Sequence, residues 1–445
     1  MTHNKPSDLA VVYIPLDTLA EYPNNPRQHD SKQIIKIQRS IESFGFINPI
    51  LVDEKGQIIA GHARLKAAQL AHMEKVPVIR LGHLSEGQKR AYRIADNKLA
   101  ELGTWSIELL QMEFKALDEL KLDMPLTITG YDMGDIDLIL EGKETKIDPK
   151  ANNIPFIPDN EIVSQEGDIW QLDKHRLICG NSLKKETLTA LMEDKKADMV
   201  FTDPPYNVKI NGHICGAGNV QHQEFKFASG EMSSEEFTQF LQTAFERLCE
   251  CSKDGSLHYI CMDWRHIKEI IVAAGVYEQF KNLCVWRKDN AGMGSFYRSQ
   301  HELIFMFKHG KEPHINNVEL GVHGRYRTNV WCYPSVNTPS EENAEKRAMH
   351  PTVKPVEMIK DAILDASNRG GIILDTFLGS GSTLIAAEKS GRICYGAELE
   401  PRYIDTAIRR YESLGKGHNA IHLSTGKTYQ ELLLEKKRGG NENGK

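Results

Sequence analysis

The first third of the chain alternates between the residue spacing of strands and the residue spacing of helices. Short apolar runs predict four strands, at Val11 to Ile14, Ile50 to Val52, Ile58 to Ala60 and Val76 to Ile79. Apolar residues three or more positions apart predict two helices, one with Ile34, Ile37 and Ile41 and one with Leu65, Ala68 and Leu70. Ser85 and Gln88 form a capping-box pattern, which predicts a third helix that continues to about Leu99. This pattern is typical of a small α/β domain.

A change of composition divides the chain into two parts. Residues 141–164 are rich in polar residues and prolines and lack a sustained period, which predicts an interdomain linker. At roughly 150 residues per domain, the length of the chain fits two or three domains. We therefore expect a domain over residues 1–125, a helical extension and linker over 126–164, a second domain over 165–433 and a disordered tail over 434–445.

The apolar segments after residue 164 predict a second, larger α/β domain. Five runs predict strands, at Ile169 to Leu172, Arg176 to Cys179, Asp198 to Thr202, Ile372 to Leu374 and Ile393 to Tyr395. The first two resemble a hairpin that leads to Asn181. Ser233 and Glu236 form a second capping box before an amphipathic helix. The last two strands flank a helix over Leu384 to Lys389 that ends at Gly391, which is the pattern of a βαβ unit.

Composition and charge exclude several classes of protein. Hydrophobic residues make up 40% and charged residues 26%, as in globular proteins. No apolar run reaches the roughly 18 residues that cross a bilayer, and the first ten residues lack the apolar stretch of a signal peptide. We therefore expect a cytoplasmic protein with no membrane partner. The eight cysteines form no CxxC pair, so neither a disulfide framework nor a metal site is expected.

The net charge of -6 argues against a protein whose whole surface binds nucleic acid. The balance reverses between Lys281 and Arg327, where eight basic residues stand against four acidic ones. Such a stretch by itself is more typical of a solvated face, so it indicates a nucleic-acid site only beside catalytic residues.

The tetrapeptide Asp203-Pro204-Pro205-Tyr206 directly follows a predicted strand. Each proline fixes φ and lacks an N–H group, so the loop is rigid and presents carbonyl oxygens. The Asp203 carboxylate and the Pro204 carbonyl can accept both hydrogens of an exocyclic amino group, while the Tyr206 ring can stack on a base. These acceptors favour the tetrahedral form of the nitrogen, whose lone pair can attack. A rigid turn with a packed tyrosine is the alternative.

A glycine turn follows the strand at Ile372 to Leu374, with the sequence Asp375-Thr376-Phe377-Leu378-Gly379-Ser380-Gly381-Ser382-Thr383. Glycines between a strand and a helix let a ligand approach the backbone, and an acid about 20 residues later can accept from ribose hydroxyls. Glu398 follows Gly379 by 19 residues. A nucleotide-binding dehydrogenase has a similar turn, but the three-glycine fingerprint is incomplete here, and the acceptor tetrapeptide has no role in hydride transfer.

Together these motifs make residues 165–415 similar to the amino-group DNA methyltransferases of the permuted β class, of the DPPY type. In that family the DPPY motif precedes the target-recognition segment and the FxGxG motif follows it, as Asp203 to Tyr206 precede Phe377 to Gly381 here. The resemblance implies a Rossmann-like, mostly parallel sheet of seven strands with one reversed strand, and S-adenosyl-L-methionine as cofactor. It also implies that His350 to Pro355 cover the methionine end of the cofactor and that Trp286 to Glu302 lie on the target-base side.

The resemblance assigns roles residue by residue. The catalytic residues, which contact the target amino group and base, are Asp203, Pro204, Pro205 and Tyr206. The cofactor-binding residues are Asn181, Asp203, Lys354, Asp375, Phe377, Gly379, Gly381, Thr383 and Glu398. The DNA-binding residues are Lys288, Arg298, Arg325 and Arg327, and a candidate target-recognition segment covers residues 309–349. Two positions depart from the family pattern: Thr376 replaces the usual proline, and Asn181 replaces the more usual aspartate that contacts the adenine amino group.

Residues Val11 to Leu102 resemble the ParB/sulfiredoxin-like domain. The likeness is carried by Ile58-Ile59-Ala60-Gly61-His62-Ala63-Arg64-Leu65, where partitioning proteins have a box that meets nucleotide phosphates. A glycine turn, a helix N-terminus and an arginine make Gly61, His62 and Arg64 a candidate anion site. No cysteine precedes Cys179, which excludes sulfiredoxin chemistry. A nuclease, a nucleotide switch, a DNA clamp and a purely structural module all stay open.

The motifs predict a two-domain methyltransferase that acts on double-stranded DNA. The target base is flipped out because its amino group cannot be reached inside the stack, and adenine N6 is the favoured acceptor. The alternatives are cytosine N4 methylation, RNA or protein-amide methylation, and a ParB-like DNA-binding protein without catalysis. A homodimer, a nucleotide bound to the N-terminal domain and a partner restriction nuclease also stay open.

Overall fold

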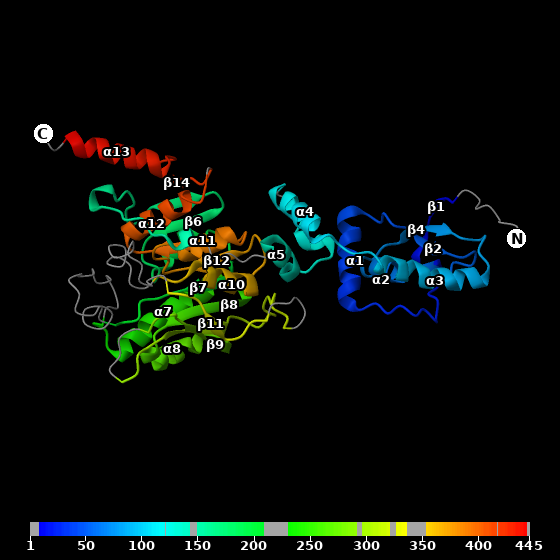
Figure 1. Ribbon diagram of the computed structural model, residues 1–445, viewed down its shortest axis with the longest axis horizontal. Coiled ribbons are helices and arrows are strands. Elements are labelled where there is room, and N and C mark those ends of the chain that lie inside the picture. Colours follow the sequence, from blue (N-terminus) through cyan, green and yellow to red (C-terminus); the bar gives the residue numbers. More distant parts are fainter. Residues whose placement is uncertain are drawn as a thin grey trace. The chain divides into compact units, whose positions relative to one another are not determined.

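A computed structural model divides the chain into two compact units, Met1–Glu144 and Thr145–Lys445 (Figure 1). The structure describes residues 9–120, 122–142, 149–208, 230–291, 296–320, 326–335, 353–415 and 417–442. Each unit has a hydrophobic core of its own. The first unit carries the smaller α/β fold that the apolar pattern predicts, and the second carries the larger one.

Unit 1 contains a four-stranded sheet in the order β1-β4-β2-β3. Its strands are β1 (Val11–Pro15), β2 (Ile50–Val52), β3 (Ile58–Ala60) and β4 (Lys75–Arg80). Its first helices are α1 (Ser31–Phe44), α2 (His62–Leu70) and α3 (Glu86–Glu101), the last with the capping box of Ser85 and Gln88. The predicted strands and helices are confirmed. Ile50, Val76 and Leu65, which set the period of β2, β4 and α2, lie in the core, whereas α1 has no fully buried residue.

Two further helices belong to unit 1, α4 (Ile107–Glu119) and α5 (Met133–Glu141). They contact each other, and the side-chain amide of Gln111 donates to the carbonyl of Leu140 at 3.1 Å. Phe114 is buried and packs edge-on against Tyr131. Residues 126–142 are therefore part of the first compact unit, and the expected boundary at residue 125 was placed too early.

Unit 2 contains a ten-stranded sheet in the order β11-β9-β10-β8-β7-β12-β13-β6-β5-β14. In chain order its strands are β5 (Ile169–Leu172), β6 (His175–Cys179), β7 (Ala197–Thr202), β8 (Ser252–Met262), β9 (Gln279–Arg287), β10 (His301–Lys308), β11 (Val330–Cys332), β12 (Ile372–Asp375), β13 (Ile393–Glu398) and β14 (Ala420–His422). The seven strands from β9 to β6 form the expected sheet, in which only β10 runs against its neighbours. Three edge strands, β11, β5 and β14, extend it beyond the seven expected.

Helices cover both faces of this sheet (Figure 1). One face carries α6 (Lys185–Met192), α7 (Ser234–Cys251) and α8 (Ile267–Ala273), and the other carries α10 (Val356–Ala366), α11 (Ser382–Lys389) and α12 (Pro401–Glu412). Successive strand residues serve opposite faces, since Met199 and Phe201 join the core with α10 while Val200 joins the core with α7. Short 3-10 helices lie at Leu16–Thr18, Leu126–Thr129, Pro149–Asn152, Asp159–Glu161, Trp264–His266 and Ala274–Val276.

Two segments expected to lack regular packing are ordered against unit 2. The carboxylate of Asp405 on α12 accepts from the backbone N–H groups of Val163 and Ser164 at 2.5 and 3.1 Å. Residues 149–164 thus pack on unit 2 and are not a free linker. The expected disordered tail is also wrong up to residue 442, because α13 (Tyr429–Glu442) continues through it and buries Tyr429 and Leu433.

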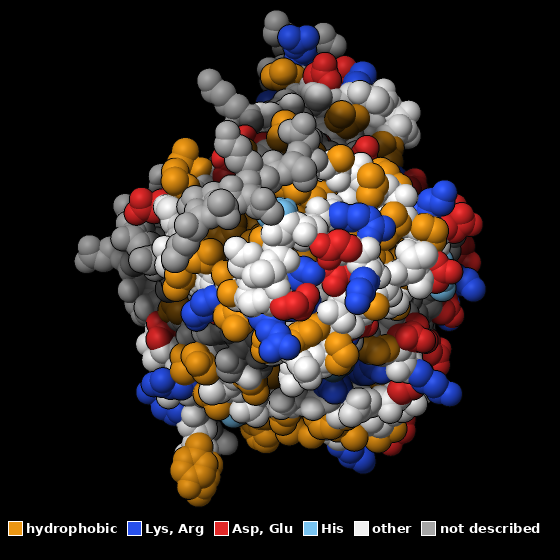
Figure 2. Space-filling model, turned by 90° about the vertical axis from the view of Figure 1, so that its right-hand side faces the viewer, with side chains coloured by type: hydrophobic (Ala, Val, Ile, Leu, Met, Phe, Trp, Pro, Cys, Tyr) orange, Lys and Arg blue, Asp and Glu red, His pale blue; other side chains and the backbone are white. Residues whose placement is uncertain are grey.

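One face of the molecule carries side chains of mixed character (Figure 2). On the face drawn in Figure 2, Lys and Arg side chains alternate with Asp, Glu and hydrophobic ones. This mixture agrees with the small negative net charge. Among the helices that the structure describes, none combines the length and the apolar character that crossing a bilayer requires.

Candidate active site

The candidate active site lies at the carboxyl edge of the parallel strands of unit 2. β7, β12, β13 and β6 are consecutive neighbours and all run parallel, so the residues at their ends meet at one edge. The chain continues from β7 to β8 on one side and from β12 to β13 on the other. Open α/β sheets bind ligands at such a switch point. Here it brings together the acceptor tetrapeptide after β7 and the glycine turn after β12.

The loop after β7 is held rigidly. The Tyr206 hydroxyl donates to Oδ1 of Asp203 at 2.6 Å. Asn207 has a φ of +51°, a region that Asn tolerates better than most residues. Its side chain binds the chain beyond the loop, since Nδ2 donates to the Met232 carbonyl at 2.9 Å and Oδ1 accepts from Gly230 N–H at 3.0 Å. Asn207 is not among the residues that the motifs predict, although an Asn directly after a rigid loop is itself a turn signal.

Lys354 lies directly before α10 and points its ammonium at this loop. Nζ donates to Oδ2 of Asp203 at 2.5 Å and to the Tyr206 hydroxyl oxygen at 3.1 Å, and it lies 3.0 Å from Oε2 of Glu302. Only 4% of the Lys354 side chain is exposed. In this structure Lys354 is thus a partner of the acceptor loop, and its contact with the cofactor stays a prediction.

Glu302 reaches the same edge because β10 is the reversed strand. An antiparallel strand begins at the edge where its neighbours end, and Leu303 at the start of β10 pairs with Met262 at the end of β8. Lys288, which follows β9, forms an ion pair with Oε1 of Glu302. We call Asp203, Tyr206, Lys288, Glu302 and Lys354 the acceptor cluster. Its two carboxylates and two cations balance each other.

Burial and ion pairing act in opposite directions within the acceptor cluster. Burial raises the pKa of Asp203, and this effect outweighs the opposing charge of Lys354. Burial also acts to raise the pKa of Glu302, but Lys354 and Lys288 together lower it to about 2. The pKa of Lys354 lies above its ordinary value because Asp203 and Glu302 overcome the effect of burial on the ammonium. The two carboxylates therefore differ in how readily they take up a proton.

Asp375 and Thr383 hold the glycine turn together from inside the protein. Oδ2 of Asp375 accepts from the Thr383 hydroxyl at 2.6 Å, and Oδ1 accepts from the Thr202 hydroxyl at 2.8 Å and from Phe377 N–H at 3.1 Å. Both side chains are buried. Burial raises the pKa of Asp375 to about 6. These two side chains shape the turn that would hold the cofactor, and their direct contact with it stays a prediction.

Gly379, Gly381 and Glu398 form the open side of the turn. Gly379 N–H donates to Oε2 of Glu398 at 2.8 Å, and Glu400 N–H donates to Oε1 at 2.9 Å. Gly379 has a φ of +53°, and a Cβ there would meet no atom within 4 Å. At Gly381, with a φ of +85°, a Cβ would lie 2.6 Å from the Ala407 Cβ. The first glycine therefore leaves space for a ligand, and the second allows α11 to pack against α12.

The remaining residues expected around the cofactor lie at the same edge. Asn181 follows β6, and its Oδ1 accepts from Leu183 N–H at 2.9 Å, which leaves one lone pair on that oxygen. Phe377 is partly buried and packs against Phe240, with ring centroids 6.0 Å apart. Burial raises the pKa of Glu398 to about 7, despite the backbone N–H donors of Glu400 and Gly379.

Arg327, an expected DNA contact, is a structural residue. Its Nε donates to Asp365 and its Nη1 donates to Asp361, both at 2.9 Å, and Nη1 also donates to the Tyr333 hydroxyl. Burial acts to lower the pKa of Arg327, but Asp365 and its other partners raise it above the ordinary value. Trp331 beside it is buried in the sheet. The charge of Arg327 is thus used within unit 2, which corrects the expectation of a phosphate contact.

The other expected DNA contacts differ in their surroundings. Lys288 is a member of the acceptor cluster, with 24% of its side chain exposed. Arg298 is exposed and donates to the Ala291 carbonyl at 2.8 Å. Arg325 lies outside the described residues, as do parts of the expected target-recognition segment, at 321–325 and 336–349, and His350 to Thr352. Phe296 and Tyr297, in the segment expected on the target-base side, are 87% and 82% exposed.

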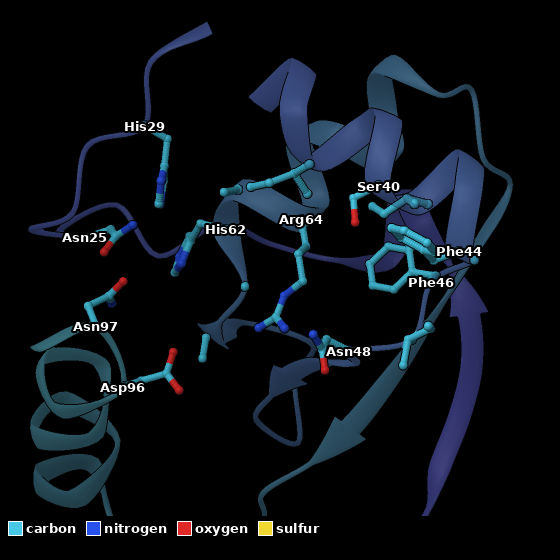
Figure 3. Close-up of a pocket in the computed structure, with 17 residues that line it drawn as sticks. Asn25, His29, Ser40, Phe44, Phe46, Asn48, His62, Arg64, Asp96 and Asn97 are labelled. Atoms are coloured by element: carbon cyan, nitrogen blue, oxygen red, sulfur yellow. The ribbon is translucent and has the colours of Figure 1, made fainter. Parts of the chain in front are cut away.

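Unit 1 contains a pocket of about 460 Å³ around its expected anion site. Gly61 is the N-cap of α2 and has a φ of +106°. Figure 3 shows the Arg64 guanidinium in the pocket between His62 and Asn48, with Asp96 across from it. Burial lowers the pKa of Arg64, against the effect of Asp96.

His62 is more enclosed than the arginine. It is buried, and its Nε2 accepts from Tyr22 N–H at 3.3 Å. Burial lowers the pKa of His62, so the ring stays neutral at pH 7. Of the three residues expected to bind an anion, Arg64 therefore supplies the charge, Gly61 the turn and His62 a wall of the pocket.

Comparison with known proteins separates the same two regions. The model of the DNA methylase family matches residues 197–409, and that of the ParB N-terminal domain matches residues 2–98. The type II methyltransferase M.ScaI of Streptomyces caespitosus is 38% identical over 293 residues, which are 59% of this chain and 86% of M.ScaI. The DNA adenine methyltransferase YhdJ of Escherichia coli (strain K12) is 29% identical over 283 residues, 56% of this chain and 86% of YhdJ. The ParB-like nuclease domain-containing protein YnaK of the same strain is 48% identical over 82 residues, 18% of this chain and 94% of YnaK.

Proposed function

Since the chain belongs to the N6/N4 DNA methylase family and is a DNA methyltransferase that uses S-adenosyl-L-methionine, we propose that it methylates adenine N6 in double-stranded DNA. The observation that carries this proposal is the place of the Asp203-Pro204 acceptors, one strand away from the glycine turn. A ligand bound at β12 and a base held at β7 would meet at this edge of the sheet.

The residues of the glycine turn suit the cofactor. Gly379 opens on free space, and the Glu398 carboxylate beside it can accept from two ribose hydroxyls. Asn181 and Phe377 would border the adenine, with the Asn181 oxygen as acceptor for the adenine amino group. When bound, S-adenosyl-L-methionine supplies an electrophilic methyl group, and its sulfur keeps the electron pair of the broken S–C bond.

The acceptor loop would orient the target nitrogen. The Asp203 carboxylate and the Pro204 carbonyl would accept its two hydrogens, so that its lone pair faces the methyl carbon. Tyr206 would stack on the flipped base, and Pro205 would keep the loop rigid. The nitrogen forms one bond to carbon and then loses one proton. Asp203, which would already accept one of its hydrogens and whose pKa burial raises, would take it up.

The choice of adenine rests on a relative and on the tetrapeptide. YhdJ, a DNA adenine methyltransferase by name, is similar to this chain over most of its own length. The acceptor geometry would also suit N4 of cytosine, because both bases carry an amino group on a ring carbon next to a ring nitrogen. Cytosine N4 is therefore the second candidate, and the family description covers both bases.

The test is transfer of a labelled methyl group from S-adenosyl-L-methionine to unmethylated duplex DNA, followed by nucleoside analysis. We expect N6-methyladenine from the wild type and none from Asp203→Ala. N4-methylcytosine would keep the mechanism and change the base. No transfer from a preparation that binds the cofactor would contradict the proposal and favour an RNA or protein substrate.

For unit 1 we propose a phosphate-bearing ligand, a nucleotide, in the pocket at Arg64. The arginine charge, the left-handed Gly61 turn and the start of α2 support it, since backbone N–H groups at a helix start attract anions. A homodimer that supplies further DNA contacts and a cytoplasmic location remain predictions of this proposal. Light scattering on the purified chain, with and without duplex DNA, tests the dimer.

A further inference from the structure

The acceptor cluster contains one more carboxylate than the acceptor role requires. Asp203 supplies the acceptor oxygens, yet Nζ of Lys354 contacts both Oδ2 of Asp203 at 2.5 Å and Oε2 of Glu302 at 3.0 Å. Lys288 pairs with the other oxygen of Glu302. Glu302 is thus an anion, 13% exposed, held between two cations at the start of the reversed strand.

Both oxygens of Asp203 are engaged in this state. Oδ1 accepts from the Tyr206 hydroxyl and Oδ2 from the Lys354 ammonium. The ammonium therefore competes with a target amino group for the same carboxylate. A cation beside the nitrogen would also oppose its attack, because that nitrogen becomes positively charged as the new N–C bond forms. Lys354 must loosen its contact with Asp203 when the base arrives.

We propose that Glu302 is a positioning residue for methyl transfer, which receives the Lys354 ammonium when the target amino group replaces it on Asp203. The inference rests on the proposed function of Asp203 as the amino-group acceptor. The movement is short because Nζ already contacts both carboxylates. Asp203 keeps its bond to Tyr206 during the exchange, so the acceptor oxygen stays oriented.

The electrostatics of the surrounding elements agree with this exchange. Burial favours the protonated form of Glu302, but the two lysines lower its pKa to about 2, so it remains an anion at neutral pH. Two further titratable groups face the cluster, Cys261 on β8 and Asp375 on β12, and burial raises the pKa of both. Besides Asp203, Glu302 is thus the carboxylate within contact distance of the Lys354 ammonium among the described groups at this edge.

Replacement of Glu302 by Gln removes the second carboxylate partner of the Lys354 ammonium and keeps the size of the side chain. Lys354 then has Asp203 as its only carboxylate partner in the acceptor cluster. We expect the single-turnover rate of methyl transfer to fall about 10- to 100-fold, with the dissociation constant for S-adenosyl-L-methionine unchanged. Glu302→Asp, which keeps the charge on a shorter side chain, should recover part of the rate.

A double variant distinguishes positioning from a merely structural role. Lys354→Met removes the cation that competes for Asp203, so Glu302 no longer has an ammonium to accept from Asp203. Adding Glu302→Gln to Lys354→Met should leave the rate within about twofold, and the double variant should be faster than Glu302→Gln alone. The double variant also keeps equal numbers of carboxylates and cations in the acceptor cluster, so this comparison holds even if Glu302→Gln folds poorly.

The pH profile provides a second readout. Without Glu302 the pKa of Lys354 falls toward its ordinary value, so the rate of Glu302→Gln should climb toward about pH 10 while the wild-type rate stays flat. Glu388→Gln is the matched control. Its carboxylate also has a pKa lowered to about 2, by His175, at the opposite edge of the sheet, and its rate and pH profile should match the wild type.

Three results would overturn the inference. They are a Glu302→Gln rate equal to that of the wild type, a double variant much slower than Lys354→Met, and a Glu302→Gln profile parallel to the wild type at high pH. Methyl transfer by the wild type itself reports on the proposed function, and the ratios between variants report on Glu302.

Discussion

Nζ of Lys354 lies 2.5 Å from Oδ2 of Asp203, although the two residues are 151 positions apart in the chain. The contact joins the loop after β7 to the segment before α10, and α10 itself packs against β7. In this state the proposed acceptor of the target amino group is already neutralised and oriented. The carboxylate is therefore ready to exchange one N–H donor for another without a change in its own position.

Asp203→Ala should abolish most of the methyl transfer and spare cofactor binding. Loss of a hydrogen-bond acceptor at the reacting nitrogen should lower the rate by about 10²- to 10³-fold. Gly379 and Glu398 are bonded to each other and not to Asp203, so the dissociation constant for S-adenosyl-L-methionine should change little. Single-turnover transfer and calorimetric titration measure the two quantities. A full rate in Asp203→Ala would refute the acceptor role.

Glu398 should make cofactor binding depend on pH. Its pKa in the ligand-free protein is raised from 4.5 to about 7 by burial, and ribose hydroxyls are better held by an ionised carboxylate. Affinity for S-adenosyl-L-methionine should therefore rise as the pH increases from about 6 to 8. Glu398→Gln should bind more weakly and lose this dependence. Titrations at several pH values test this, and an equal slope in both proteins would speak against it.

The same group should change the stability of the ligand-free protein in the opposite sense. Because the folded pKa lies above the unfolded value of 4.5, the stabilising contribution of Glu398 is complete below that value and is lost as the pH rises through about 7. Glu398→Gln mimics the protonated form. Its melting temperature should exceed that of the wild type at pH 8 by more than it does at pH 5. The comparison is made by thermal unfolding without ligand.

The two glycines of the turn should respond differently to alanine. Gly381→Ala should destabilise unit 2, because its Cβ would lie 2.6 Å from the Ala407 Cβ. Gly379→Ala meets no atom within 4 Å and adds only the left-handed backbone cost of about 1 kcal/mol, but its methyl group enters the ligand space. We expect a clear fall in melting temperature for the first and weaker cofactor binding for the second. The reverse pattern would contradict the assignment of the two glycines.

The sequence predicts a DNA contact for both Arg327 and Arg298, but their replacement should have different effects. Arg327→Ala removes the guanidinium that pairs with Asp361 and Asp365 and should cost about 3 kcal/mol of unfolding free energy. Arg298→Ala, at an exposed position, should leave stability unchanged and weaken DNA binding in a salt-dependent way. Urea unfolding and DNA binding at two salt concentrations separate the two effects. A loss of DNA affinity in a stable Arg327→Ala would restore its expected DNA contact.

Arg64→Ala should remove nucleotide binding by unit 1. The guanidinium is the main positive charge that the described residues place in this pocket, so its loss should abolish binding of a fluorescent nucleoside triphosphate. Arg90 on α3 is exposed and does not line the pocket, which makes Arg90→Ala the matched control. If both variants bind equally, the pocket is not the nucleotide site.

Local patterns predicted the secondary structure well. The capping boxes at Ser85 and Ser233 and the strand that leads to Asp203 all lie where the apolar period and cap residues indicate. These features depend on neighbours within one turn or one strand, so a single chain contains them. The segments without a period were predicted less well. Val163 and Ser164, at the end of the expected linker, are held by Asp405, a partner more than 200 positions away that no local pattern reveals.

The sequence by itself determined the two α/β units, the acceptor and glycine motifs, and the family, because these depend on residue type, spacing and order. Only the tertiary structure decided how charged residues are used. Lys354, Lys288 and Arg327 are all basic residues in the sequence. In the structure the two lysines pair with the carboxylates of the acceptor cluster, whereas Arg327 pairs with aspartates elsewhere in unit 2. Glu302 joins that cluster because β10 is antiparallel. The physical reason is that ion pairs form between residues that the sheet order brings together, and sheet order is a property of the whole chain.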